Sequence, residues 1–118
     1  RTTPTLVQSL KLALGSSHFI WTGTGENPYP AILGFCDTVL VTADSVNMAS
    51  EAACTGKPLY IFPLPGVSAK LRRFHTSLED HGASRPFNGV LDTWTYSRLT
   101  EADRAASWLL DQLGWRPR

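Results

Sequence analysis

The stretch of sequence that decides the fold is Thr38 to Phe62, TVLVTADSVNMASEAACTGKPLYIF. It opens with TVLVT at 38–42, a continuous apolar run in which hydrophobic and polar residues do not alternate. Strands that are buried on both faces of a parallel sheet have this pattern, whereas half-exposed strands alternate. We therefore expect 38–42 to form a central strand.

A helix and a second strand follow this first strand. Asp44 or Ser45 can cap a helix over 45–55, because both side chains can accept a hydrogen bond from an amide of the first turn. Gly56 is typical of a helix end, and LYIF at 59–62 has the composition of another buried strand. Two apolar strands joined by a helix are parallel neighbours in α/β sheets.

The flanking sequence continues the alternation of helices and strands. We expect helices near 4–14, from Asn27 to before Asp37, over 68–81 and from Thr100 to Gly114, a buried strand HFIW at 18–21, and a loop around 86–89. This order predicts one α/β domain over 1–118, Rossmann-like, with a doubly wound, mainly parallel sheet. Since the chain opens on RTTP without an initiator Met or a leading strand, we expect it to be excised from a longer chain.

The composition is that of an ordinary globular domain. Of 118 residues, 42% are hydrophobic and 18% are charged, which suffices for a buried core and excludes a disordered chain. The formal net charge of +1 provides no basic surface for nucleic acid. We therefore expect no nucleic-acid partner.

Two further features bear on location. No stretch approaches the roughly 18 consecutive apolar residues that span a bilayer, and the N-terminus lacks the order of a signal peptide. We interpret Cys36 and Cys54 as reduced core residues, because both lie in apolar sequence. These features predict no membrane insertion and a cytoplasmic location, with peripheral attachment to a membrane through a missing part of the protein as the alternative.

Several kinds of chemistry lack their sequence pattern. His18, His75 and His81 have no metal-ligand spacing with the two cysteines. Gly23 and Gly25 do not form the G-x-G-x-x-G of a dinucleotide-binding loop, and neither a nucleophile elbow nor a phosphate-binding loop with Lys and Ser or Thr occurs. We therefore expect no metal and no cofactor.

The loops that follow the strands form the candidate site, because ligands of open α/β sheets bind outside the carboxyl ends of the strands. These loops are 22–27, 42–47 and 63–70. The middle loop leads into a helix whose free amides and positive dipole end favour an anion such as a diphosphate. The candidate contacts there are Thr42, Asp44 and the amides of Ser45, Asn47 and Met48.

Two neighbouring features extend this candidate site. Glu51 lies less than two turns into the helix, where its carboxylate can accept hydrogen bonds from the vicinal hydroxyls of a ribose. The alternative is an ordinary solvated helix residue. The second small-residue loop can pass beside a base or a phosphate, or it can be a plain strand-to-helix turn; its residues are Thr22, Gly23, Thr24 and Gly25.

A basic cluster follows the third loop. Lys70 and Arg73 share one face of the helix expected over 68–81, and Arg72 and His75 share another. Either face can neutralise a phosphate or meet an acidic partner. The alternative is a solvated charged helix.

The stretch TADSVNMASEAACTGKPLYIFPLPG resembles the nucleotide-sugar motif of glycosyltransferases with two Rossmann domains, the GT-B architecture. The shared features are a strand, a small-residue loop, a Ser-Glu pair on the helix, then Gly-x-Pro and a strand. The resemblance implies that Ser50 and Glu51 are the motif pair, with Glu51 contacting ribose and Ser45 opening the diphosphate cradle. The motif usually has a glycine where this chain has Asp44, and an Asp repels a diphosphate unless it caps the helix or binds a cation.

A more specific resemblance covers roughly 1–99. GTGENPY, VTADSVNMASEAACTGKP and KLRRFHTSLEDHGASRPFNG resemble the C-terminal half of the DUF1022 family. That family is often labelled with plant mitochondrial-fission proteins named for elongated mitochondria.

These resemblances imply two different functions. In the first, the chain is the domain of a GT-B-like glycosyltransferase that binds a nucleoside-diphosphate sugar, and a missing N-terminal domain binds the acceptor. The isolated domain is then expected to be inactive. The alternative is a non-catalytic protein-recruiting module of a mitochondrial-fission-type protein, which a surface apolar patch near Phe87 or Trp94 would favour.

Overall fold

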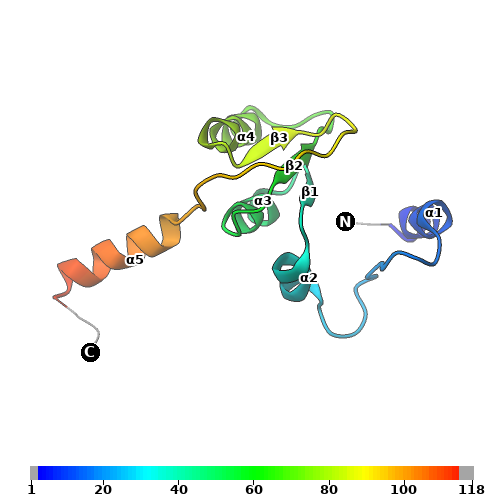
Figure 1. Cartoon of the computed structure of the whole chain (residues 1–118), viewed down its shortest axis with the longest axis horizontal. Helices are drawn as coiled ribbons and strands as arrows, with labels where there is room; N and C mark the ends of the chain where they lie inside the picture. The colour runs from blue at the N-terminus through cyan, green and yellow to red at the C-terminus, as the bar shows by residue number, and fades with distance from the viewer. Residues whose placement is uncertain (1–2, 115–118) are drawn as a thin grey trace. The chain divides into compact units, whose positions relative to one another are not determined.

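The protein is a mixed α/β chain with a small parallel sheet, as a computed structural model shows (Figure 1). The structure describes residues 3–114; for residues 101–103 it describes only the backbone. The elements in order are α1 Pro4–Leu14, α2 Tyr29–Phe35, β1 Val39–Thr42, α3 Val46–Ala53, β2 Leu59–Phe62, α4 Ala69–His81, β3 Ser84–Pro86 and α5 Glu101–Gln112. The chain divides into two compact units, Arg1–Ile32 and Leu33–Arg118. The sheet and the helices α3 and α4 belong to the second unit.

The sheet has the strand order β1-β2-β3, and both neighbouring pairs are parallel. The parallel pairing of 38–42 with 59–62 through an intervening helix is confirmed. The central position expected for 38–42 is wrong, because β1 lies at an edge of this sheet and β2 lies in the middle. Burial of β1 on both faces is also not observed, since Val41 is buried and Leu40 is 50% exposed. An unbroken apolar run carries no information about which strand lies at an edge.

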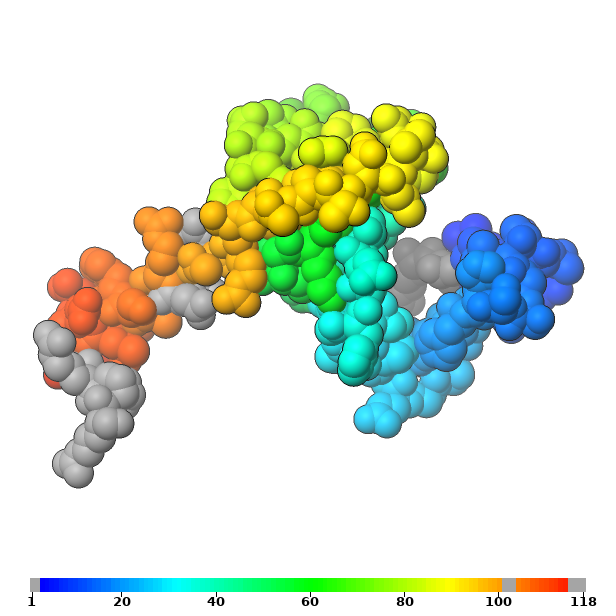
Figure 2. All heavy atoms as spheres, viewed as in Figure 1, coloured from blue at the N-terminus to red at the C-terminus, as the bar shows by residue number. Residues whose placement is uncertain are grey.

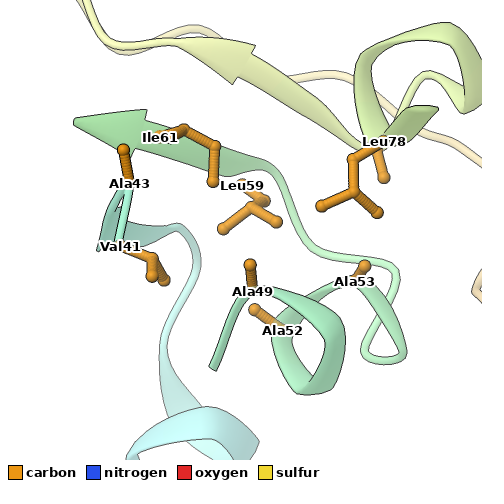
Figure 3. Packing of buried hydrophobic residues seen from close by; sticks show 9 residues of the cluster. Val41, Ala43, Ala49, Ala52, Ala53, Leu59, Ile61 and Leu78 are labelled. Carbon is orange, nitrogen blue, oxygen red and sulfur yellow. The ribbon is translucent and has the colours of Figure 1, made fainter. Parts of the chain in front are cut away.

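Helices α3 and α4 pack against the same face of the sheet (Figure 3). Val41, Leu59 and Ile61 point toward these helices, because alternate residues of a strand face the same side. The matching face of α3 consists of alanines that let the helix approach the sheet closely; they are Ala49, Ala52 and Ala53. The helices on the opposite face that a doubly wound sheet requires stay a prediction.

The opposite face of the sheet is covered in part by an extended segment, residues 87–99, which we term the strap. Figure 2 shows the strap, in yellow and orange, on the front of the second unit in this view. Tyr60 is only 2% exposed beneath it, with ring centroids 5.7 Å from Phe87 and 5.2 Å from Trp94. Both pairs are edge-to-face, the arrangement that aromatic quadrupoles favour.

Side-chain hydrogen bonds fasten the strap to the rest of the second unit. The Asp92 amide donates to the Tyr60 hydroxyl at 2.6 Å, and the Trp94 indole N–H donates to the Gly82 carbonyl at 2.8 Å. The Tyr96 hydroxyl donates to the Lys57 carbonyl at 2.5 Å. Because these bonds occur at several points along the strap, its backbone is held without regular secondary structure.

Three local predictions are wrong. No strand forms at 18–21, because no described residue pairs with this run and its Phe19 is largely exposed. A third strand, Ser84–Pro86, replaces the first part of the expected loop and pairs with β2 through Leu59 and Ser84. Cys36 and Cys54 are both free thiols, but Cys54 is exposed and is not a core residue.

The remaining helices occur close to where the sequence predicts them. Thr3 caps α1, and the Asn27 side chain accepts a hydrogen bond from the Tyr29 amide at the start of α2. Gly82 ends α4 in the left-handed conformation with φ 88°, which only glycine adopts without strain. Thr100 stands at the start of α5 but makes no capping hydrogen bond with its side chain.

Candidate functional site

The loop between β1 and α3 is the centre of the predicted site. Of the two possible caps, Ser45 caps α3, and its hydroxyl accepts a hydrogen bond from the Met48 amide at 3.4 Å. The Asp44 carboxylate instead accepts from the Thr42 hydroxyl at 2.7 Å. The Ser45 amide donates to the Thr42 carbonyl at 3.2 Å.

This geometry is a poor cradle for a diphosphate. Asp44 is exposed beside the start of α3 without capping it, so its negative charge repels an incoming phosphate. Two of the three amides expected to bind phosphate, those of Ser45 and Met48, already donate to protein oxygens. An anion at this position would therefore compete with bonds that the folded chain makes by itself.

The other candidate residues on α3 lie on its outer side. The buried face of α3 is formed by its alanines, which turns Asn47 and Glu51 toward solvent and leaves Ser50 half-buried. The Glu51 carboxylate is exposed, and α3 side chains lean toward the helix start, which is the direction of the β1–α3 loop. Glu51 is therefore accessible to a ligand at that loop.

The second predicted loop, 22–25, belongs to the first unit. Gly23 and Gly25 have positive φ values of 93° and 79°. The Trp21 indole N–H donates to the Thr24 carbonyl at 2.9 Å, and the hydroxyls of Thr22 and Thr24 lie 3.5 Å apart. This loop is an exposed turn closed by its own hydrogen bonds.

The second unit contains a cavity of about 370 Å³ at the carboxyl end of the sheet, on the face that α3 and α4 cover. Its walls are α4, the ends of the three strands and the loop after β2. The apolar wall consists of Ala43, Ile61, Pro63, Leu64, Gly66, Val67 and Pro86. The polar wall consists of Arg72, His75, Thr76 and Glu79, all from α4.

His75 is the most buried polar residue of this cavity, at 7% exposed. Its Nε2 lies 2.6 Å from the Ala43 carbonyl oxygen, and because a carbonyl only accepts, Nε2 carries the proton and donates. The other ring nitrogen, Nδ1, is buried and has no hydrogen-bond partner among the residues that the structure describes. A buried polar atom without a partner is uncommon in proteins.

Of the two faces of α4 that the sequence offered for ligand binding, the cavity is lined by the one that carries Arg72 and His75. Lys70 and Arg73 are exposed and do not line it, whereas Arg72 and His75 do. Sequence reasoning missed the lining roles of Thr76 and Glu79. Their spacing from Arg72, four and seven residues along a helix, places all of them on one face and was a readable signal.

An apolar surface lies on the opposite face of the sheet, and we term it the apolar patch. It consists of Leu40, Phe62, Val90 and Leu91, each between 42% and 63% exposed. Phe62 lies against the half-buried Phe87, with ring centroids 6.3 Å apart. Arg85 and Asp92 provide charge at its margin, with 3.8 Å between the guanidinium and the carboxylate.

Comparison with known proteins identifies the family. A family model described as "Mitochondrial fission ELM1" matches residues 1–113. The chain belongs to the Mitochondrial fission ELM1 family. The DUF1022 resemblance, which was stated together with the mitochondrial-fission label, is thereby confirmed.

Two known proteins are similar in sequence to this chain. The chain is 38% identical over 103 residues to "Mitochondrial fission protein ELM1" of Arabidopsis thaliana, covering 82% of this chain and 24% of that protein. It is 36% identical over 115 residues to "Uncharacterized protein RP120" of Rickettsia prowazekii (strain Madrid E), covering 90% of this chain and 32% of that protein. The chain thus spans about a quarter to a third of the length of these relatives.

Other comparisons give no further identification. No solved structure matches the chain significantly. None of the helices in the described residues is both long and apolar enough to cross a membrane. Within the same part of the chain, no three His, Cys, Asp or Glu side chains gather closely enough to hold a metal ion.

Proposed function

We propose that this chain is a protein-recruiting domain of a mitochondrial-fission-type protein and that the apolar patch holds its partner. The observation that supports this most directly is the patch itself, which lies beside Phe87 on the sheet face opposite α3 and α4. Membership of the Mitochondrial fission ELM1 family gives the biological setting. The Arabidopsis relative is named for the same process.

The energetics of the patch fit a binding surface. Burying a large apolar side chain completely stabilises a complex by about 1.5–3 kcal/mol, and the patch side chains are only about half covered in the free chain. Covering Leu40, Phe62, Val90 and Leu91 together therefore contributes several kcal/mol, on the order of what separates a millimolar from a micromolar complex. An apolar centre beside charged residues such as Arg85 is the usual plan of a protein interface.

Complementation tests this function. In Arabidopsis thaliana cells that lack the related fission protein, the relative is supplied with its matching segment replaced by this chain. We expect the chimaera to restore normal mitochondrial length. Leu40→Asp and Leu91→Asp place a charge in the patch, so we expect them to abolish restoration at unchanged protein level. Because Leu12 is exposed on α1 outside the patch, Leu12→Asp is the matched control and should restore length. Restoration by both patch variants would overturn the proposal.

A second candidate is a nucleotide-sugar-binding function in a GT-B-like glycosyltransferase. It is supported by the exposed Glu51 of α3, whose side chain leans toward the capped start of the helix and the loop after β1. In that case the rest of the protein would supply the acceptor site, including the missing N-terminal domain, and this domain alone would be inactive. The exposed Asp44 carboxylate weighs against it.

An amide-shift NMR titration with UDP, GDP, CMP and their sugar conjugates tests this second candidate. We expect saturable shifts over 42–51 for the correct nucleotide, weakened by Glu51→Ala. Unchanged binding in Glu51→Ala would remove the assigned ribose contact, and absence of any shift at millimolar nucleotide would favour the recruiting function. Asn47→Ala changes another exposed residue of the same helix, so comparing it with Glu51→Ala shows whether the loss of binding is specific to Glu51.

A further inference from the structure

The polar wall of the cavity is rich in hydrogen-bond acceptors. His75 also lines this wall, with its Nε2–H engaged by the Ala43 carbonyl and its Nδ1 buried. The Thr76 hydroxyl donates its hydrogen to the Arg72 carbonyl at 2.9 Å, so toward any other group its oxygen can only accept. Glu79 adds a carboxylate that forms no ion pair within the described part of the chain. A ligand that satisfies this wall must carry several donors.

A single cation stands at the other end of the polar wall. Arg72 donates one N–H from Nη1 to the Val67 carbonyl at 2.7 Å, which orients the guanidinium and leaves four N–H groups for other acceptors. It forms no salt bridge with any described carboxylate. Seven residues of helix separate Arg72 from Glu79, or about 10 Å along the axis. The wall therefore offers an anion site at Arg72 and a site for hydrogen-bond donors at Glu79. A single small ligand can reach both.

The apolar wall restricts the chemical class of the ligand further. Pro63, Leu64 and Val67 provide an aliphatic surface, and no Phe, Tyr or Trp lines the cavity. Recognition of an unpaired nucleobase commonly uses stacking on an aromatic side chain, which the described lining of this cavity does not offer. At about 370 Å³ the cavity lies at the small end of ligand sites, which range from about 300 to 1,000 Å³.

We propose that this cavity binds a phosphorylated monosaccharide, with its phosphate on Arg72 and its ring hydroxyls donating to the Glu79 carboxylate and to the Thr76 oxygen. This goes beyond the recruiting function and does not depend on it. The same chemistry is present in a free sugar phosphate and in the glycosyl-phosphate portion of a nucleotide sugar. The experiment therefore tests both kinds of ligand, the free sugar phosphate and the nucleotide sugar.

The test is methyl NMR on the full-length protein with labelled Ile, Leu and Val. Ile61, Leu64 and Val67 report from the cavity, and Leu40 and Leu91 report from the apolar patch. The probes are glucose 1-phosphate, glucose 6-phosphate, UDP-glucose, UDP and inorganic phosphate. We expect saturable shifts of the three cavity methyls with at least one sugar phosphate or with UDP-glucose, and no shift of the patch methyls.

Charge-neutral variants and their neighbours test the assigned contacts. Arg72→Gln removes a charged hydrogen-bond donor, so we expect the Kd to rise about 10-fold or more. Arg73→Gln is the matched control, because Arg73 is the adjacent exposed residue and lies outside the cavity lining. Glu79→Gln should weaken sugar phosphates while leaving inorganic phosphate unchanged, and Asp80→Asn is its control. The methyl spectrum of each variant establishes that it is folded.

The relative affinities of the probes identify the ligand and test the site. Tighter binding of a free sugar phosphate than of UDP-glucose, or the reverse, identifies the source of the ligand, and both support the site if Arg72→Gln weakens them. Equal affinity for inorganic phosphate and the sugar phosphates would overturn it, because the ring would then contribute nothing. Absence of cavity shifts with every sugar-containing probe, or binding that Arg72→Gln leaves unchanged, would also overturn it. Loss of recruitment in Leu91→Asp with intact sugar-phosphate binding would leave this site standing independently of the recruiting function.

Discussion

Alkaline stability provides a sharp test of how the strap is held. The Tyr96 hydroxyl donates to the Lys57 carbonyl at 2.5 Å, and its ring lies 6.3 Å from that of His81. Burial, with a smaller contribution from the negative charge of the nearby Cys54, raises the pKa of Tyr96 from 10.0 to about 12. The folded chain therefore favours the neutral phenol. We expect Tyr96 to stabilise the fold fully below about pH 10 and to lose that contribution as the pH rises through about 12.

The size of this effect follows from the shift. Two pKa units correspond to about 2.7 kcal/mol if the group is fully shielded from solvent. Tyr96 is only partly buried, so solvent screening reduces the expected loss to about 1–2 kcal/mol between about pH 10 and 12. Tyr96→Phe has no titrating group, but it leaves the Lys57 carbonyl without its donor, which costs about 1 kcal/mol at neutral pH.

Urea denaturation of the wild-type chain and Tyr96→Phe measures both the alkaline loss of stability and the cost of the lost hydrogen bond. We expect the wild type to be more stable by about 1 kcal/mol near pH 8, and this difference to vanish or reverse sign near pH 12. Titration of the lysines and of the other tyrosines is common to both chains and cancels in the difference. A stability difference that stays constant from about pH 8 to 12 would refute the reasoning. Cys54→Ser should make the alkaline loss slightly smaller, because it removes the second cause of the shift.

Three further predictions test the fold. Leu59→Ala empties a fully buried position between the sheet and its helices, so urea denaturation should show a loss of about 3–5 kcal/mol. Gly82→Ala forces alanine to φ 88° and should cost about 1 kcal/mol in thermal melts, whereas Gly34→Ala in α2, where φ is not positive, should cost nothing. Trp94→Phe removes the bond to the Gly82 carbonyl, so hydrogen exchange of the strap amides should accelerate roughly fivefold; Trp21→Phe, outside the strap, should not change it.

Local sequence signals predicted the strand-helix-strand unit correctly. Ser45, one of the two expected caps, caps the helix, and the two apolar runs pair in parallel. Each of these outcomes depends on residues close in sequence. The position of β1 at the sheet edge does not, because it depends on which distant segment occupies the neighbouring place. HFIW at 18–21 forms no strand for the same reason, because a segment of strand-like composition forms a strand only where a partner supplies the hydrogen bonds.

The candidate site was less predictable because helical spacing leaves one question open. It states which side chains share a face of α4, but it does not state which face meets the sheet. The apolar residues Leu71 and Leu78 could have answered this, since His75 lies four residues after one and three before the other. Their stripe places His75 on the buried side, and Leu78 is in the core. Arg72 then follows from its spacing to His75, whereas Arg73 lies outside the lining.

The sheet separates the two surfaces that carry the proposals. Ile61 points to the helices and lines the cavity, whereas its neighbour Phe62 points to the other face and belongs to the apolar patch. Adjacent residues of β2 thus serve opposite faces, and no described side chain belongs to both surfaces. We therefore expect Leu91→Asp to impair recruitment without changing sugar-phosphate binding, and Arg72→Gln to do the reverse. Measuring both properties in both variants shows whether the domain has two sites, because coupled losses would mean that one face controls the other through the strand they share.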